Sequence, residues 1–146
     1  MRLDRMTYFH PAPDRSPALL AAIAAGGALG GLCRYVFARV LPPAANGFPW
    51  ATFWTNVSGS LLLGLVVVLT VRRFPENRWV RPFLATGVLG AYTTFSTLVV
   101  EIDLLTGHGY GSTAILYAAA SLVTGLGAAW AGLVLGRRLW PASRLP

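Results

Sequence analysis

The chain has 146 residues, of which 55% are hydrophobic and only 12% are charged, and this composition indicates an integral membrane protein rather than a soluble domain. Its twelve basic residues are all arginines and outweigh five acidic residues, for a net charge of +7. Such a basic chain can bind nucleic acid. Here most arginines bracket long apolar runs, as membrane topology requires, so the sequence predicts no nucleic-acid partner.

The chain begins with a polar, proline-bearing stretch, residues 1–16, which we interpret as a flexible tail. Its arginines precede an alanine-rich run at 18–28, an arrangement also found in signal peptides. The apolar run continues to about Leu41, however, and three further long apolar runs follow. A first membrane helix over about Pro17–Leu41 is therefore favoured, ended by Pro42-Pro43.

Two overlapping pairs of glycines, Gly26/Gly30 and Gly27/Gly31, predict close helix contact on this first helix. Arg34 lies about two turns before its predicted end. A buried counter-charge role and snorkelling to the membrane surface are equally open for this side chain.

A second helix is predicted over about Trp50–Val71, and it carries one polar stripe. Thr52, Asn56 and Ser60 recur every four residues and so share a face. An unpaired amide is costly in hydrocarbon, so Asn56 either bonds a neighbouring helix or lines a water-filled path. The weakness of the third apolar segment favours the path.

That third segment, about Val80–Leu105, is long enough to cross a bilayer, yet its centre is a poor helix. Residues 87–97 combine two glycines with four serine and threonine residues. A packed continuous helix is one interpretation, but a helix broken near its centre is favoured, and such breaks often form ion sites. Glu101 continues the face of Thr94 and Thr97, either as a functional carboxylate or bonded to a hydroxyl or a helix end.

The fourth helix is predicted over about Tyr110–Leu135, so residues 17–140 form a four-helix membrane domain followed by a tail at 141–146. Tyr117, Ser121 and Thr124 share one face of this helix. The chain contains no nucleotide-binding motif, no zinc-type ligand cluster and no nucleophile paired with a base, so no enzymatic activity is predicted. The small residues that suit close packing on another face are Gly125, Ala129, Gly132 and Gly136.

The arginines predict the topology. Four helices place both termini on one side, where the first tail holds three arginines, the loop between the second and third helices four, and the C-terminal end three. The other side holds Arg39, or two arginines if Arg34 is counted. By the positive-inside rule, both termini face the cytoplasm.

Residues 90–97 (Gly-Ala-Tyr-Thr-Thr-Phe-Ser-Thr) with Glu101 resemble the CrcB/Fluc family of fluoride channels. The third-segment motif is specific, and the resemblance covers about Ala24–Gly136. The matching positions elsewhere are Gly26-Gly27 through Arg34-Tyr35, Thr52, Asn56, Gly59-Ser60, Tyr117 and Ser121.

The resemblance implies an all-α membrane protein that forms an antiparallel dimer with two narrow pores and exports fluoride passively across the cytoplasmic membrane, which lowers fluoride toxicity. It also implies a structural sodium ion, bound by the backbone carbonyls of Gly90 and Thr93. The implied pore-lining residues are Asn56, Phe95, Ser96, Tyr117 and Ser121, with Thr52 nearby.

These residue types suit a small, strongly hydrated anion. Hydroxyl and amide groups donate hydrogen bonds in place of water, and the positive edge of a phenyl ring can face an anion. Without a fixed lysine the pore also binds its ion weakly enough to release it.

Two features depart from the implied homodimer. The family pattern has a second phenylalanine three residues after the first, and here Leu98 stands in that position. An antiparallel homodimer also needs copies in both orientations, whereas the arginine bias here is strong. We therefore hypothesise that the chain pairs with an oppositely oriented family member as a heterodimer.

Two other functions remain open from the sequence. A small proton-coupled multidrug exporter would need a carboxylate in its first helix, which has none. A non-conducting assembly subunit would tolerate replacement of Asn56 and Phe95.

Overall fold

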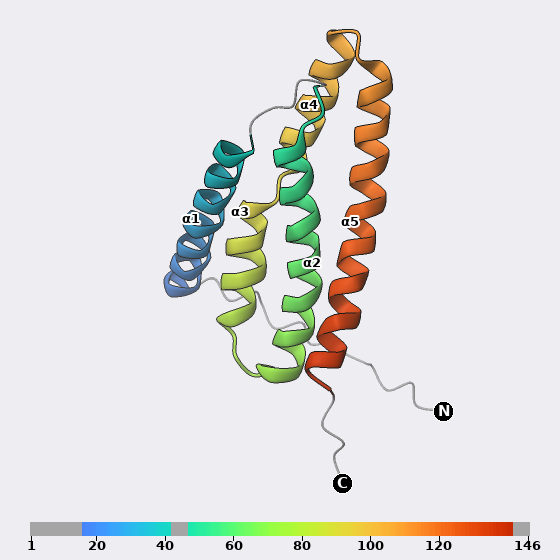
Figure 1. Cartoon of the computed structure of the whole chain (residues 1–146). Helices are drawn as coiled ribbons and strands as arrows, with labels where there is room; N and C mark the ends of the chain where they lie inside the picture. The colour runs from blue at the N-terminus through green and yellow to red at the C-terminus, as the bar shows by residue number, and fades with distance from the viewer. Residues whose placement is uncertain (1–15, 42–46, 142–146) are drawn as a thin grey trace, which may run out of the picture.

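A computed structural model describes residues 16–41 and 47–141, which form helices joined by short connections (Figure 1). Within these ranges four helical spans are long and apolar enough to cross a membrane, which confirms the predicted multi-pass architecture. Except for Ser16 and Pro141, the predicted tails lie outside the described residues, as does the predicted Pro42-Pro43 helix end.

The first span is α1, Pro17–Val40, and the second is α2, Trp50–Arg73. α1 begins with a proline at its first position, and its N-cap Ser16 accepts a hydrogen bond from the Leu19 amide (3.3 Å). α2 is two residues longer than predicted, because Arg72 and Arg73 continue the helix. The Arg72 guanidinium donates to the Trp140 carbonyl oxygen (2.6 Å) and so caps the end of the last helix with a positive charge.

The third span contains the predicted interruption near its centre. It consists of η1 (Pro82–Leu89, a π-helix), α3 (Gly90–Tyr92) and α4 (Phe95–Gly107). The predicted break is confirmed at Thr93 and Thr94, whose φ/ψ angles of −78°/157° and −149°/119° are extended. The π-helical turns before the break were not predicted from the sequence.

The last span, α5, runs Gly111–Leu139 and packs along the whole of α2. The break lets the third span change partners: η1 and α3 pack on α1, whereas α4 packs on α5 (Figure 1). The start of α1 and the end of α5 lie at the same end of the bundle (Figure 1). The third span therefore contacts α1 before the break and α5 after it.

Glycines allow the close approach of α1 to η1 and of α2 to α5. A Cβ atom on Gly26 would lie 3.1 Å from the Val88 amide nitrogen, and one on Gly30 would overlap the Val88 carbonyl, so this predicted pair is confirmed. A Cβ atom on Gly27 would lie 4.0 Å from the Ala91 Cβ atom, an ordinary contact, and one on Gly31 would meet no described atom within 4 Å, so the second predicted pair makes a looser contact than the first. The contact between α2 and α5 follows the predicted small-residue face of α5. All of its members lie within contact distance of α2, namely Gly125, Ala129, Gly132 and Gly136.

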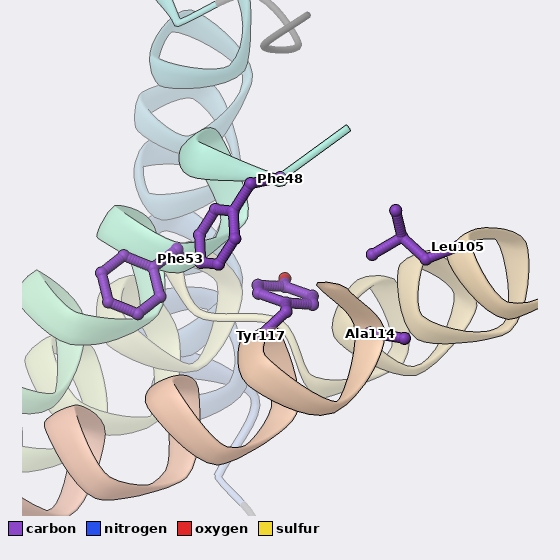
Figure 2. Packing of buried hydrophobic residues seen from close by; sticks show 5 residues of the cluster. All are labelled: Phe48, Phe53, Leu105, Ala114 and Tyr117. Carbon is purple, nitrogen blue, oxygen red and sulfur yellow. The ribbon is translucent and has the colours of Figure 1, made fainter. Parts of the chain in front are cut away.

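A small aromatic core lies where α2 begins, α4 ends and α5 begins (Figure 2). Figure 2 shows its five buried members, and the ring of Phe48 meets that of Tyr117 edge-on at 5.2 Å between centroids. Elsewhere all four spans carry exposed large apolar side chains, as surfaces that meet lipid or another subunit do.

Candidate ion-conduction site at the helix break

The break is held open by the side chain of Asn56. Its Oδ1 accepts from the Thr94 amide (2.9 Å), and its Nδ2 donates to the Thr94 carbonyl oxygen (2.9 Å). One side chain therefore bonds both backbone polar groups of Thr94, at the interruption within the membrane. The bond to a neighbouring helix, left open from the sequence, is thus present, and Asn56 also lines the cavities on both sides of the break.

Beyond the break, α4 begins with a fully formed cap. Thr94 Oγ1 accepts from the Thr97 amide (3.2 Å) and lies 2.9 Å from Thr97 Oγ1. This helix start lies in the middle of the span, where the positive end of its dipole and its first amide groups favour an anion. The Ser96 hydroxyl is exposed and lies 3.3 Å from Thr94 Oγ1.

Three predicted pathway residues meet in one groove of about 400 Å³ between α2, α4 and α5. Asn56, Phe95 and Ser121 line it, together with Leu98. The Phe95 ring is 79% exposed in the single chain. Ser121 Oγ is buried and has no hydrogen-bond partner among the described residues, so its hydroxyl is available to a ligand in the groove.

Of the other three predicted pathway residues, Ser96 lies at the cap beside Thr94, and Thr52 and Tyr117 lie in a separate cluster around Glu101. Thr52 donates to Glu101 Oε1 (2.8 Å), and Tyr117 donates to Glu101 Oε2 (2.7 Å). Tyr117 is completely buried, and its side chain belongs to the aromatic core of Figure 2. Sequence reasoning missed this pairing, although it left open that Glu101 bonds a hydroxyl.

The Glu101 cluster gives a direct prediction. Tyr117→Phe removes one of two hydrogen bonds to the carboxylate without changing the ring, and we expect it to lower the free energy of unfolding by roughly 1.5–3 kcal/mol. Tyr110→Phe, which changes an exposed tyrosine, is the matched control. Reversible unfolding in mixed detergent would measure both. Equal stabilities for the two variants would contradict the role assigned to this bond.

Two further cavities open on the hydroxyl face of α4. One of about 510 Å³ is lined by Thr52, Thr97 and Glu101, and opens beside His108. The other, of about 310 Å³, shares Thr52 and Thr97 and is bounded by Arg34. The face of α4 that carries the threonines and Glu101 therefore borders these two cavities. Arg34 of α1 lines the second of them.

The break also frees backbone carbonyls, among them those of Gly90 and Thr93. In a continuous α-helix the Gly90 carbonyl would accept from the Thr94 amide, but that amide bonds Asn56 instead. The Thr93 carbonyl would accept from the Thr97 amide, which bonds Thr94 Oγ1. Gly90 and Thr93 line a cavity of about 290 Å³. Carbonyl oxygens released in this way are suitable ligands for a hard cation such as sodium.

Comparison with known proteins agrees with these features. Residues 21–133 match a family described as "CrcB-like protein, Camphor Resistance (CrcB)". The chain is 51% identical over 120 residues to "Fluoride-specific ion channel FluC" of Deinococcus radiodurans, covering 80% of this chain and 94% of that protein. It is 42% identical over 122 residues to "Fluoride-specific ion channel FluC" of Agrobacterium fabrum, covering 83% and 98%.

A third relative, "Fluoride-specific ion channel FluC 3" of Streptomyces avermitilis, is 46% identical over 119 residues, covering 82% of this chain. The match spans 58% of that relative's length, and 66% of "Fluoride-specific ion channel FluC 2" from the same organism. The family match covers most of the chain, including the break, the groove and the Glu101 cluster. The chain therefore belongs to the CrcB/FluC family of fluoride-specific ion channels.

Proposed function

We propose that this chain is a passive, fluoride-selective channel of the cytoplasmic membrane that exports fluoride and so lowers its toxicity to the cell. The observation that carries this proposal is the groove at the break, where Asn56, Phe95 and Ser121 meet. The relatives are named as fluoride-specific channels, which favours this function over a proton-coupled multidrug exporter. Membership of a channel family also agrees with the absence of enzymatic activity predicted from the sequence.

The groove offers what a small anion needs in exchange for its water. Ser121 brings a buried unpaired hydroxyl, and the Asn56 amide retains a second N–H hydrogen besides the one that bonds Thr94. The edge of the Phe95 ring carries positive charge density. None of the described arginines lines the groove, so the ion meets only partial charges from these residues and can leave again. The membrane potential then drives the anion out of the cell without ATP.

The groove is half of a pore, because a single chain leaves the Phe95 ring 79% exposed. A second subunit against α4 would cover this ring and close the groove. We infer an antiparallel dimer with a pore along the interface on each side. The partner is either a second copy or an oppositely oriented family member.

The implied structural cation fits the residues at the break. Gly90 and Thr93 each have a carbonyl whose usual helical donor bonds elsewhere. Sodium bound by these oxygens would supply positive charge that holds the two half-helices together. This chain's own contribution is to keep the two carbonyls in place, through Asn56 and the cap at Thr94.

The arginines support an orientation with both termini in the cytoplasm. Six described arginines lie at or beside the helix ends on the side where α1 begins, namely Arg72, Arg73, Arg78, Arg81, Arg137 and Arg138. At the opposite end of α1, the last turn contains Arg39. This asymmetry favours a single orientation for all copies.

Fluoride efflux from liposomes that contain this chain alone tests the proposal. If the chain forms an active homodimer, we expect efflux of fluoride but not of chloride, with copies in both orientations by protease accessibility. If it is half of a heterodimer, as Leu98 and the arginine bias indicate, efflux requires a co-expressed family member. Folded protein without fluoride efflux in either preparation would contradict the proposal.

A variant separates a pore-lining subunit from a non-conducting assembly subunit. Phe95→Leu keeps the apolar size but removes the ring edge, as position 98 already does. For a pore-lining residue we expect fluoride efflux to fall roughly two- to tenfold, from an edge interaction of about 0.5–1.5 kcal/mol. The same substitution in an assembly subunit would leave efflux by the active preparation unchanged.

A further inference from the structure

Three consecutive residues at the break each meet α2 within one of its turns. In only one of these contacts were both partners predicted from the sequence to be functional. The contact pairs are Tyr92 with Ser58, Thr93 with Gly59, and Thr94 with Asn56.

The first pair is a hydrogen bond between two hydroxyl groups. Ser58 Oγ lies 2.9 Å from the Tyr92 hydroxyl and also donates to the Trp54 carbonyl oxygen (2.7 Å). Because the single Ser58 proton goes to Trp54, the Tyr92 hydroxyl is the donor to Ser58. Tyr92 is buried, and its ring meets Phe37 of α1 edge-on at 6.4 Å. This side chain therefore ties the last residue of α3 to both α2 and α1.

The second pair depends on the absence of a side chain. A Cβ atom on Gly59 would overlap the methyl group of Thr93 and lie 3.2 Å from the Tyr92 ring. Thr93 is held from its other side by the Leu89 carbonyl oxygen, which accepts from its amide (3.0 Å) and its hydroxyl (2.9 Å). Thr93 thus fits between η1 and a glycine surface on α2.

We infer that residues 56–59 of α2 form a template that sets the direction of the two free carbonyls at the break, and that Tyr92 and Ser58 are positioning residues for cation binding there. Tyr92 lies between Gly90 and Thr93, so its orientation fixes both carbonyls through the intervening backbone. The inference rests on the cation site of the proposed function. It assigns a role to two hydroxyl groups that lie outside the pore groove.

Sodium-dependent thermal stability of the purified full-length chain tests this role without measuring conduction. The unfolding temperature would be followed as choline is replaced by sodium at constant ionic strength. For Tyr92→Phe, which loses only the hydroxyl, we expect the half-saturating sodium concentration to rise about fivefold, equivalent to about 1 kcal/mol. Tyr110→Phe controls for loss of an exposed tyrosine hydroxyl and should leave it unchanged.

Ser58→Ala removes the hydrogen bond between Ser58 and Tyr92 by deleting its acceptor. It also provides the test if Tyr92→Phe fails to fold. We expect it to produce the same rise, and the double variant to show no further rise, because both substitutions delete one interaction. A sodium requirement equal to that of the unaltered chain in both single variants would overturn the inference. So would an unaltered chain that sodium does not stabilise, even if it conducts fluoride.

The opposite combination separates the two proposals. In this combination sodium stabilises the unaltered chain, and both variants need more sodium for the same effect, while no preparation conducts fluoride with any partner. This result would overturn the proposed function and support the positioning role. In an active preparation, Tyr92→Phe should shift the sodium dependence of fluoride efflux and leave its fluoride-over-chloride selectivity intact. A loss of selectivity with unchanged sodium dependence would instead place Tyr92 in the pore and overturn the inference.

Discussion

Replacing Asn56 with leucine is expected to abolish fluoride efflux and to lower the free energy of unfolding by roughly 2–6 kcal/mol. Leucine has a similar size but makes neither hydrogen bond, so the Thr94 amide and carbonyl both lose the 2.9 Å partners that Asn56 gives them. Each unsatisfied buried group costs about 1–3 kcal/mol. The interrupted span has no water in the hydrocarbon region to replace these bonds.

Asn56→Asp separates the two roles of this residue. Aspartate still accepts from the Thr94 amide, but when ionised it cannot donate to the carbonyl, and its charge repels an anion in the groove. We therefore expect a smaller loss of stability than with leucine and an equal loss of efflux. Thr70→Val, which deletes a buried α2 hydroxyl bonded to its own helix, controls for the loss of a polar group. Near-normal stability of Asn56→Leu would show that the Thr94 backbone finds other partners and that its two hydrogen bonds to Asn56 are dispensable.

The sequence was sufficient to predict the four spans and the break, because both depend on local properties. Apolar length alone separates the spans. The third segment is long enough to cross the membrane, but its centre contains two glycines and several threonines, which are poor helix formers. The interruption falls within that stretch, at Thr93 and Thr94. The groove was also predictable in part, since Asn56, Phe95 and Ser121 meet there.

What could not be predicted depends on how the two halves of the third span diverge. The break turns α4 toward α5, so Glu101 accepts a hydrogen bond from the Tyr117 hydroxyl, a pairing that the sequence did not predict. The same turn lets η1 and α3 pack tightly against α1 at Gly26 and Gly30, while Gly27 is only in ordinary contact with Ala91 and Gly31 meets no described atom within 4 Å. Spacing along one helix cannot decide between such overlapping pairs, since both offer equally small surfaces. The positioning residues Ser58 and Tyr92 are likewise paired only by tertiary contact.

Gly132→Val is expected to separate the two helices that carry the groove, with a loss of about 1–3 kcal/mol or more in stability and a loss of fluoride efflux. A Cβ atom on Gly132 would overlap the Leu61 carbonyl and lie 3.1 Å from the Gly64 Cα atom. Both obstacles are backbone atoms, which cannot rotate away as the end of a side chain can. The substitution must therefore move α5 relative to α2.

Gly127→Val provides the matched control, because Gly127 lies in the same helix and a Cβ atom there meets no atom within 4 Å. It imposes the same cost in helix propensity without touching α2. Unfolding free energy and fluoride efflux should both be near normal for Gly127→Val and strongly reduced for Gly132→Val. Since Asn56 lies on α2 and Ser121 on α5, a few tenths of an ångström between these helices alter the width of the groove itself. Equal behaviour of the two variants would mean that the contact between α2 and α5 can loosen without affecting the groove, contrary to the close packing of the two helices at Gly64 and Gly132.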